Sequence, residues 1–180
     1  MPTPGSLDPL TRLPRRSNFL LALQLASEEA RNDRWTLGLV LVQVDRLDGF
    51  QAQSTHRQVL PTVSKVIRLA CGSGNLVGHL EDSLFAIMKL DTSCEQTHAT
   101  AERCRFAVEH RFADRARPLT VSVGAVSSPM FLAWSSGHLM ALAAWRMGQS
   151  RAAGGNAVCG AGFDPRLRQR FANWPAHRTL

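Results

Sequence analysis

Four stretches of the sequence, rich in apolar residues, predict the strands of this chain. Residues 36–44, TLGLVLVQV, are apolar almost throughout, which predicts a central strand buried on both faces. Residues 76–90 hold two apolar runs around the short break Glu81-Asp82-Ser83, which predicts a β-hairpin. Residues 119–127 alternate apolar and small residues as a half-buried strand does, and residues 157–159 predict a short last strand.

Between these strands, apolar residues recur at helical spacing. Asp8-Pro9 fits a helix N-cap with proline at the first helical position. Pro61 is tolerable only near the first turns of its helix, because proline lacks a backbone N–H group. The predicted helices span residues 19–32, 56–70, 94–112 and 137–153.

The order of these elements predicts an α+β fold. Helices separated by strands, with one antiparallel hairpin, favour a mixed, mainly antiparallel sheet flanked by helices around a β-α-β-β-α-β core. With 180 residues, 44% of them hydrophobic, the chain suits one well-buried core. We expect a lead-in at residues 1–6, one domain at residues 7–160, and a tail or linker at residues 161–180.

The charge of the chain adds little about its partners. The net charge of +7 comes from 21 basic residues, and only Lys65 and Lys89 among them are lysines. Arginine favours bidentate contact with phosphates or carboxylates, but scattered arginines are usually a solvated surface. Nucleic acid is therefore an unlikely partner, since charge alone would motivate it.

The cysteines and the apolar runs predict a cytoplasmic protein. The cysteines form no C-x-x-C pair, which indicates reduced and mostly packed thiols without a disulfide framework or a zinc site. No apolar run approaches the roughly 18 residues that span a bilayer, and the N-terminus has no signal-peptide core, so no membrane association is expected. The four cysteines are Cys71, Cys94, Cys104 and Cys159.

Five short motifs occur in one order and at one spacing. Residues 8–16 read DPLTRLPRR, residues 42–45 read VQVD, residues 55–56 read TH, residues 120–124 read TVSVG, and residues 154–156 read GGN. Together they resemble the GGDEF family, the bacterial diguanylate cyclases that condense two GTP molecules into cyclic di-GMP. The resemblance covers roughly residues 7–159 and implies the cyclase-type palm fold.

The signature of that family is degenerate in this chain. In the register set by the motifs, GGDEF falls on Glu81, Asp82, Ser83, Leu84 and Phe85, so only the phenylalanine is retained. The pattern is similar to degenerate signatures in GGDEF domains that precede an EAL domain in FimX-like proteins.

The resemblance implies that both metal-binding acids are replaced. The family holds its metal ions with one acid at a strand end and one in the signature, and these positions are Gln43 and Ser83 here. Mg²⁺ prefers carboxylates and phosphates over an amide or a hydroxyl, so no metal site and no cofactor are expected. Asp45 would be displaced by roughly 6.6 Å at about 3.3 Å per residue, and we expect it to pair with a nearby arginine. Glu81 and Asp82 would repel a triphosphate.

Other positions carried over from the family imply weak nucleotide contacts. The asparagine that contacts ribose or guanine is Gln51, and the phosphate-binding lysine is Arg151, a partial retention. The helix-start aspartate is Leu60, and the arginine of the late G-R-N motif is Gly155. Residues 72–75, GSGN, lack both the arginine and the aspartate of the R-x-x-D motif that binds cyclic di-GMP in active relatives.

The sequence therefore favours a domain that is not an enzyme and has a regulatory or protein-docking role in cyclic di-GMP signalling. Its expected partner is another signalling protein or a flanking EAL or sensor domain, and a dimer stays open. The first alternative is a module that binds GTP or cyclic di-GMP without turnover, using Arg151 and Arg16. A weakly active diguanylate cyclase is the next alternative.

Overall fold

The computed structural model describes residues 7–47, 52–114, 118–128 and 134–160, with the side chains of the second helix described from Arg57 onward. The predicted lead-in at residues 1–6 and the tail at residues 161–180 lie outside this part of the chain. The elements are α1 (Arg16–Asp33), β1 (Leu37–Val44), α2 (Ala52–Cys71), β2 (Leu76–Glu81), β3 (Leu84–Leu90), α3 (Cys94–Arg111), β4 (Val121–Ser127), α4 (Ser136–Ala152) and β5 (Ala157–Cys159).

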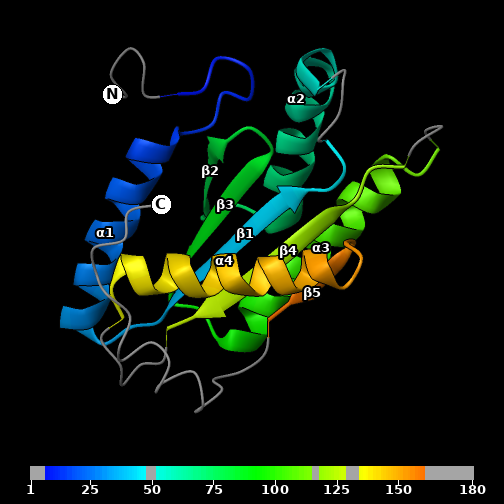
Figure 1. The fold of residues 1–180 in the computed structure, drawn as a ribbon. Helices are drawn as coiled ribbons and strands as arrows, with labels where there is room; N and C mark the ends of the chain where they lie inside the picture. The colour runs from blue at the N-terminus through cyan, green and yellow to red at the C-terminus, as the bar shows by residue number, and fades with distance from the viewer. Residues whose placement is uncertain (1–6, 48–51, 115–117, 129–133, 161–180) are drawn as a thin grey trace.

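The five strands form one mixed sheet in the order β2-β3-β1-β4-β5 (Figure 1). Neighbouring strands are antiparallel except β4 and β5, which are parallel. The run from β1 to β4 is the predicted β-α-β-β-α-β core, with α1 before it and α4 and β5 after it. The α+β fold class is confirmed.

Strand β1 lies at the centre and is buried on both faces, as its apolar run predicts. Val40 and Val42 pack into a core with α2 and α3, while Leu39 and Leu41 pack into a second core with α1 and α4. Because successive side chains of a strand point to opposite faces, a continuous apolar run supplies both cores.

Strand β4 is covered on both faces, so the prediction of a half-buried strand is wrong. Gly124 faces α4 and allows the helix to approach closely, whereas Ala125 packs into the core on the other face. A Cβ atom on Gly124 would lie 2.5 Å from the backbone nitrogen of Met147, and Ser150 Oγ donates a hydrogen bond to the carbonyl oxygen of Val123 at 2.8 Å. Small side chains here mark close helix packing rather than exposure to solvent.

The prediction of a helix starting at Asp8 is also wrong. Asp8 Oδ1 accepts hydrogen bonds from the backbone N–H groups of Leu10 at 3.1 Å and Thr11 at 2.8 Å, and from Thr11 Oγ1 at 2.9 Å. The same side-chain bonding pattern that caps a helix also closes a turn. The N-cap of α1 is Arg15, with no side-chain hydrogen bond at the cap.

Helix α2 begins at Ala52 rather than at residue 56, which places Pro61 in its interior. The expectation that Pro61 lies near the helix start is therefore wrong. Ser64 Oγ donates a hydrogen bond to the carbonyl oxygen of Pro61 at 2.9 Å. Among the described residues, none of the helices is both long and apolar enough to span a membrane.

Candidate functional site

The end of β1 and the hairpin between β2 and β3 bring Gln43 and Ser83 together. In the β1–β3 pairing Gln43 lies opposite Leu84, and the backbone N–H of Val44 donates to the carbonyl oxygen of Ser83 at 3.0 Å. The side-chain amide of Gln43 donates a hydrogen bond to Ser83 Oγ. Ser83 is buried and Gln43 is half-buried, so the pair is partly shielded from water.

This pair does not fit a magnesium ion. Both side chains are neutral, and Gln43 turns its amide nitrogen rather than its carbonyl oxygen toward Ser83. Magnesium is bound in proteins mainly through carboxylates and phosphates. Within the described part of the chain, no group of three or more His, Cys, Asp or Glu residues is placed to hold a metal ion.

The hairpin tip carries two carboxylates. Glu81 pairs with Leu84 across the turn, and the turn residue Asp82 has a φ of 34°. Arg16, the first residue of α1, donates through Nη1 to Glu81 Oε1 at 3.0 Å. Both side chains of this ion pair are partly exposed, so it orients Glu81 more than it stabilises the fold.

His79 joins the hairpin to the turn that precedes α1. Its Nδ1 lies 3.3 Å from Asp8 Oδ1, and its Nε2 lies 2.9 Å from the carbonyl oxygen of Asp82. Its ring stacks on Phe85 with 4.9 Å between centroids, and its backbone N–H donates to the carbonyl oxygen of Pro14 at 2.9 Å. The side chain is 9% exposed, so these contacts are largely shielded from solvent.

Asp8 is ionised in this arrangement. Burial alone would raise the pKa of its carboxyl group, but hydrogen bonds from Thr11 and His79 outweigh burial and lower the pKa below 3.8. The local turn could be expected from the sequence, since aspartate closes such turns. The contact between Asp8 and His79 joins residues 71 positions apart, so no local periodicity in the sequence predicts it.

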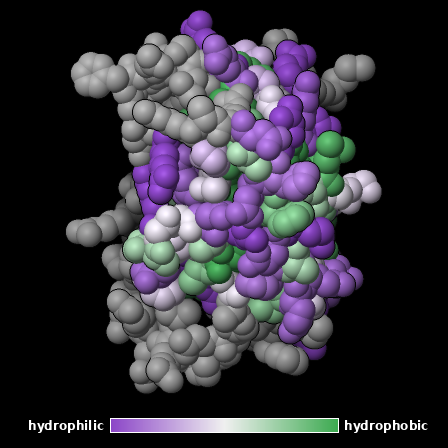
Figure 2. Space-filling model, turned by 90° about the vertical axis from the view of Figure 1, so that its right-hand side faces the viewer, coloured by the Kyte–Doolittle hydropathy of each residue, from purple (hydrophilic) through white to green (hydrophobic). Residues whose placement is uncertain are grey.

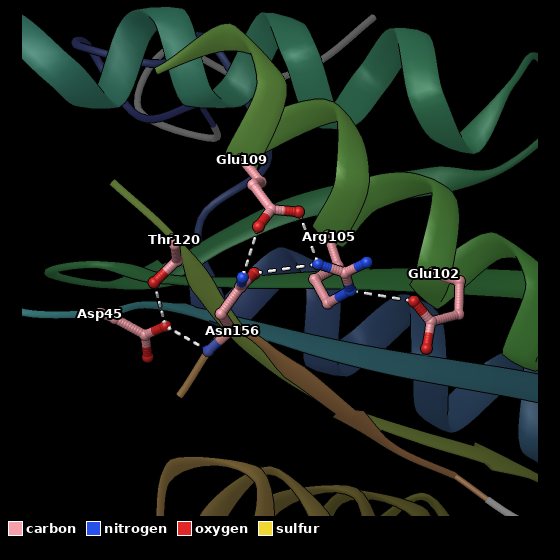
Figure 3. Close-up of polar contacts among 6 residues, drawn as sticks. All are labelled: Asp45, Glu102, Arg105, Glu109, Thr120 and Asn156. Carbon is pink, nitrogen blue, oxygen red and sulfur yellow. Dashed lines mark hydrogen bonds and ion pairs between the residues drawn. The ribbon is translucent and has the colours of Figure 1, made fainter. Parts of the chain in front are cut away.

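Asp45 lies at the end of β1 and is bound on its β4 and β5 side. Its carboxylate accepts hydrogen bonds from Thr120 Oγ1 at 2.8 Å, Ser122 Oγ at 2.6 Å and the backbone N–H of Asn156 at 3.0 Å; the bonds from Thr120 and Asn156 are drawn in Figure 3. A Cβ atom on Gly155 would lie 2.9 Å from Asp45 Oδ2. These bonds hold the carboxylate against the start of β4 and the loop after α4.

Arg105 forms its ion pairs with Glu102 and Glu109 (Figure 3). Arg105 donates to Glu102 at 2.9 Å, to Glu109 at 2.8 Å and to Asn156 Oδ1 at 3.0 Å. The hydrogen bond from Asn156 at 2.6 Å, followed by that from Arg105, lowers the pKa of Glu109. The spacing of the three charged residues on α3 could have predicted their ion pairs, whereas the link to Asn156 joins elements distant in sequence.

The other positions predicted from the family do not join Gln43 and Ser83, or they lie outside the described residues. Gln51 is outside the described residues. Arg151 is exposed in the last turn of α4, and Leu60, on α2, is buried in the core that α2 and α3 form with the sheet. Asn75 Nδ2 donates to the carbonyl oxygen of Cys71 at 2.8 Å, so this position closes the end of α2.

The fold defines the class of this protein: it is a cyclase-palm-like α+β domain with a hairpin at the end of its central strand. The family model described as "Diguanylate cyclase, GGDEF domain" matches residues 6–157. The chain therefore belongs to the GGDEF family. No curated protein sequence shows significant similarity to it.

Solved GGDEF structures share the fold. The coiled coil and GGDEF domain of DgcB from Caulobacter crescentus, in complex with c-di-GMP, is 25% identical with a TM-score of 0.79, over 87% of this chain and 85% of that chain. The FimX GGDEF domain from Pseudomonas aeruginosa is 22% identical with a TM-score of 0.78, over 86% of this chain and 99% of that chain. SiaD from Pseudomonas aeruginosa, in complex with its activator SiaC, is 18% identical with a TM-score of 0.78, over 87% of this chain and 62% of that chain.

Proposed function

We propose that this chain is a catalytically inactive GGDEF domain with a regulatory or protein-docking role in cyclic di-GMP signalling. The observation that carries the proposal is the hydrogen bond between Gln43 and Ser83 at the two positions where the family places metal-binding acids. Phosphoryl transfer depends on metal ions that position the triphosphate and neutralise its charge. An amide and a hydroxyl at these two positions give such ions no carboxylate.

The hairpin tip is a second obstacle to catalysis. Where the family has two glycines, this chain has Glu81 and Asp82, whose side chains add volume and negative charge. Carboxylates close to a triphosphate repel it. The pairing of Glu81 with Arg16 reduces this repulsion and also occupies a cation that a phosphate would need.

A docking role suits the preserved fold and the mixed character of the surface. Figure 2 shows one face, on which hydrophilic and hydrophobic residues are interspersed without a broad apolar area. Interfaces that form and dissociate have a similar mixture of polar and apolar surface. The proposed partner is another signalling protein or a flanking EAL or sensor domain, and SiaD bound to SiaC is an example of a GGDEF-fold protein with a protein partner. The large apolar side chains exposed on the described helices are Leu21, Leu25, Leu69, Phe106 and Trp145.

Isothermal titration of the full chain with GTP in the presence of Mg²⁺, followed by chromatography of the reaction mixture, tests the loss of catalysis. We expect neither magnesium-dependent binding nor cyclic di-GMP formation. An active GGDEF enzyme assayed in the same buffer is the positive control. Formation of cyclic di-GMP above the background of a heat-denatured sample would overturn the proposal.

A second candidate is nucleotide binding without turnover. It is supported by the exposed position of Arg151 on α4 and by the matching DgcB structure, which holds c-di-GMP. A thermal-shift screen with GTP, GDP and cyclic di-GMP separates the two candidates, because a ligand at a hundred times its Kd adds about 2.7 kcal/mol of stability. A shift with any of them, reduced in Arg151→Ala, would favour this candidate.

A further inference from the structure

The solvent-facing side of α1 carries an apolar stripe formed by Leu21 and Leu25. Their side chains are 58% and 52% exposed, although leucine is usually buried. The two residues lie one helical turn apart, so their side chains are neighbours on one face. The opposite face of the helix, with Phe19 and Leu23, packs into the core. The packing of the domain therefore does not account for the stripe.

Acidic side chains lie next to the stripe, toward the C-terminal end of α1. Glu28 and Glu29 follow Leu25 by three and four positions, which places them beside it on the helix surface, and both are exposed. Glu28 accepts a hydrogen bond from Gln24 Nε2 at 3.2 Å, and neither acid forms a salt bridge with another described residue. The stripe and these acids together favour an occupant that is both apolar and basic.

The segment that follows β5 has this complementary chemistry. Residues 161–180 lie outside the described part of the chain, and their sequence holds four arginines against one acid, Asp164. Large apolar residues recur in it every three or four positions, the spacing that aligns side chains on one face of a helix. Amphipathic segments of this kind bind apolar surfaces through such aligned residues. The apolar residues are Phe163, Leu167, Phe171 and Trp174, and the arginines between them are Arg166, Arg168 and Arg170.

The other exposed apolar residues of the described helices suit a basic segment less well. Leu69, Phe106 and Trp145 are each the only large apolar side chain exposed on its described helix, so none of them forms a stripe. Leu69 and Trp145 each stand next to an arginine in the sequence, and the acids near Phe106 are already paired with Arg105. Both the apolar area and the charge therefore favour α1.

The end of β5 is within reach of α1. Strand β5 is parallel to β4, and β4 is antiparallel to β1, so β5 ends at the end of the sheet where β1 begins and α1 stops. Helix α1 covers β2, where Phe19 packs on Gly78. Four strand spacings of about 4.8 Å, roughly 19 Å, separate β5 from β2. Ten extended residues span roughly 33 Å, so the segment after Gly160 is long enough to reach the stripe.

We propose that residues 163–174 dock on the Leu21–Leu25 stripe of α1, with their arginines beside Glu28 and Glu29. Burial of the apolar side chains on both sides favours the contact, and the opposite charges select this helix over the others. The inference goes beyond the proposed function, because the occupant of the surface is the tail of the chain itself. Its test needs neither a nucleotide nor a partner protein, so its outcome is independent of the test of catalysis.

Trypsin cleavage of the native full chain tests the contact, because trypsin cuts after arginine. Mass spectrometry follows cleavage after Arg166, Arg168 and Arg170, and cleavage after Arg178, beyond the docked segment, is the internal standard. If the segment must leave α1 before it is cut, the cleavage rate follows the population of the undocked state. Leu21→Ser/Leu25→Ser should therefore accelerate cleavage at the first three sites at least about fivefold relative to the standard. Glu28→Lys/Glu29→Lys should act in the same direction.

Leu69→Ser is the matched control, since it replaces a leucine that is 83% exposed on another helix. Its cleavage rates should equal those of the wild type, and so should those of the wild type at different protein concentrations. Equal rates in the wild type and the α1 variants would overturn the proposal. Acceleration by Leu69→Ser as large as by the α1 variants, or protection that grows with protein concentration and so comes from a second copy, would also overturn it.

A photo-crosslinking measurement keeps the test decisive if an α1 variant fails to fold. Phe171 is replaced by the photoreactive residue p-benzoylphenylalanine in the otherwise unaltered chain, and the crosslinked peptides are identified by mass spectrometry. We expect crosslinks within the chain to peptides of α1 that contain Leu21 or Leu25. Crosslinks mainly to α2, α3 or α4, or to a second copy of the chain, would refute the docking of the tail on α1.

Discussion

The side-chain amide of Gln43 donates a hydrogen bond to the hydroxyl of Ser83, although 40 positions separate the two residues. In the register predicted from the motifs, each residue falls on a position where the family has a metal-binding acid, and each is neutral. A single acid at either position could still accept a hydrogen bond from its neighbour. Two acids would repel each other unless a cation lay between them.

This relationship predicts a magnesium-dependent variant. In Gln43→Asp/Ser83→Asp, the two carboxylates should destabilise the domain in chelator and be rescued by Mg²⁺, because the cation binds the folded state. Thermal unfolding with 2 mM EDTA or about 10 mM Mg²⁺ measures the rescue, which reaches about 2.7 kcal/mol at a hundred times the Kd.

The single variants Gln43→Asp and Ser83→Asp are the matched controls for this experiment. Each supplies one carboxylate, so their melting temperatures should respond to Mg²⁺ as weakly as that of the wild type. An equal magnesium response in the wild type and the double variant would show that these two positions do not form the site.

The loop after α4 offers a comparison of two glycines. Gly154 and Gly155 both have positive φ, 111° and 80°, but only Gly155 points its Cβ position at a neighbour, Asp45 Oδ2 at 2.9 Å. Asp45 is held by three hydrogen bonds and cannot move away freely. Gly155→Ala should therefore cost about 1–3 kcal/mol more than Gly154→Ala in chemical denaturation.

Equal destabilisation by the two alanines would indicate that the Asp45 carboxylate yields to the new methyl group. The variant Asp45→Asn/Gly155→Ala then serves as a check. Asparagine keeps the size of the Asp45 side chain and removes its charge. Any loss of unfolding free energy beyond that of Gly155→Ala therefore measures the hydrogen bonds that the Asp45 carboxylate accepts.

The backbone conformation of Asp82 at the hairpin tip predicts different stabilities for two substitutions at this position. Asp82 has a φ of 34°, a region that glycine adopts freely and β-branched residues avoid. Asp82→Gly should leave the free energy of unfolding within about 1 kcal/mol of the wild type, whereas Asp82→Val should lower it by about 1–2 kcal/mol. The contact with His79 uses the backbone carbonyl of residue 82, so the side chain can be exchanged in both variants. A valine as stable as the glycine would contradict the backbone conformation described.

Much of the fold follows from local pattern. The apolar run of β1 predicts burial on two faces, since its alternate side chains enter different cores. The meeting of Gln43 and Ser83 follows once the motifs fix the register of the hairpin. Local pattern misleads at Asp8, because one aspartate can cap a helix or close a turn, and the two differ only in the backbone that follows.

The contacts that the sequence does not predict are those between polar groups of distant elements. His79 binds Asp8 across the sheet edge, and Asn156 binds both Asp45 and Glu109. Polar residues at strand ends show no periodicity. The local sequence therefore does not distinguish a polar side chain that faces solvent from one that is hydrogen-bonded to a distant element. Asp45 was expected to pair with an arginine for its charge, yet hydroxyl groups and a backbone amide are its hydrogen-bond donors.

The buried thiol of Cys104 gives the last prediction. Burial raises its pKa to about 12, and the side chain is fully shielded between α3 and the sheet. Because the thiolate is the form that reacts with iodoacetamide, Cys104 should be alkylated only when the domain unfolds, even near pH 9. Its labelling rate, measured by mass spectrometry, should therefore follow the unfolding rate across a denaturant series. The partly exposed Cys159 is the internal control, and its labelling should begin in the native protein. If Cys104 were labelled as fast as Cys159 without denaturant, the core around α3 would have to open far more often than its packing allows.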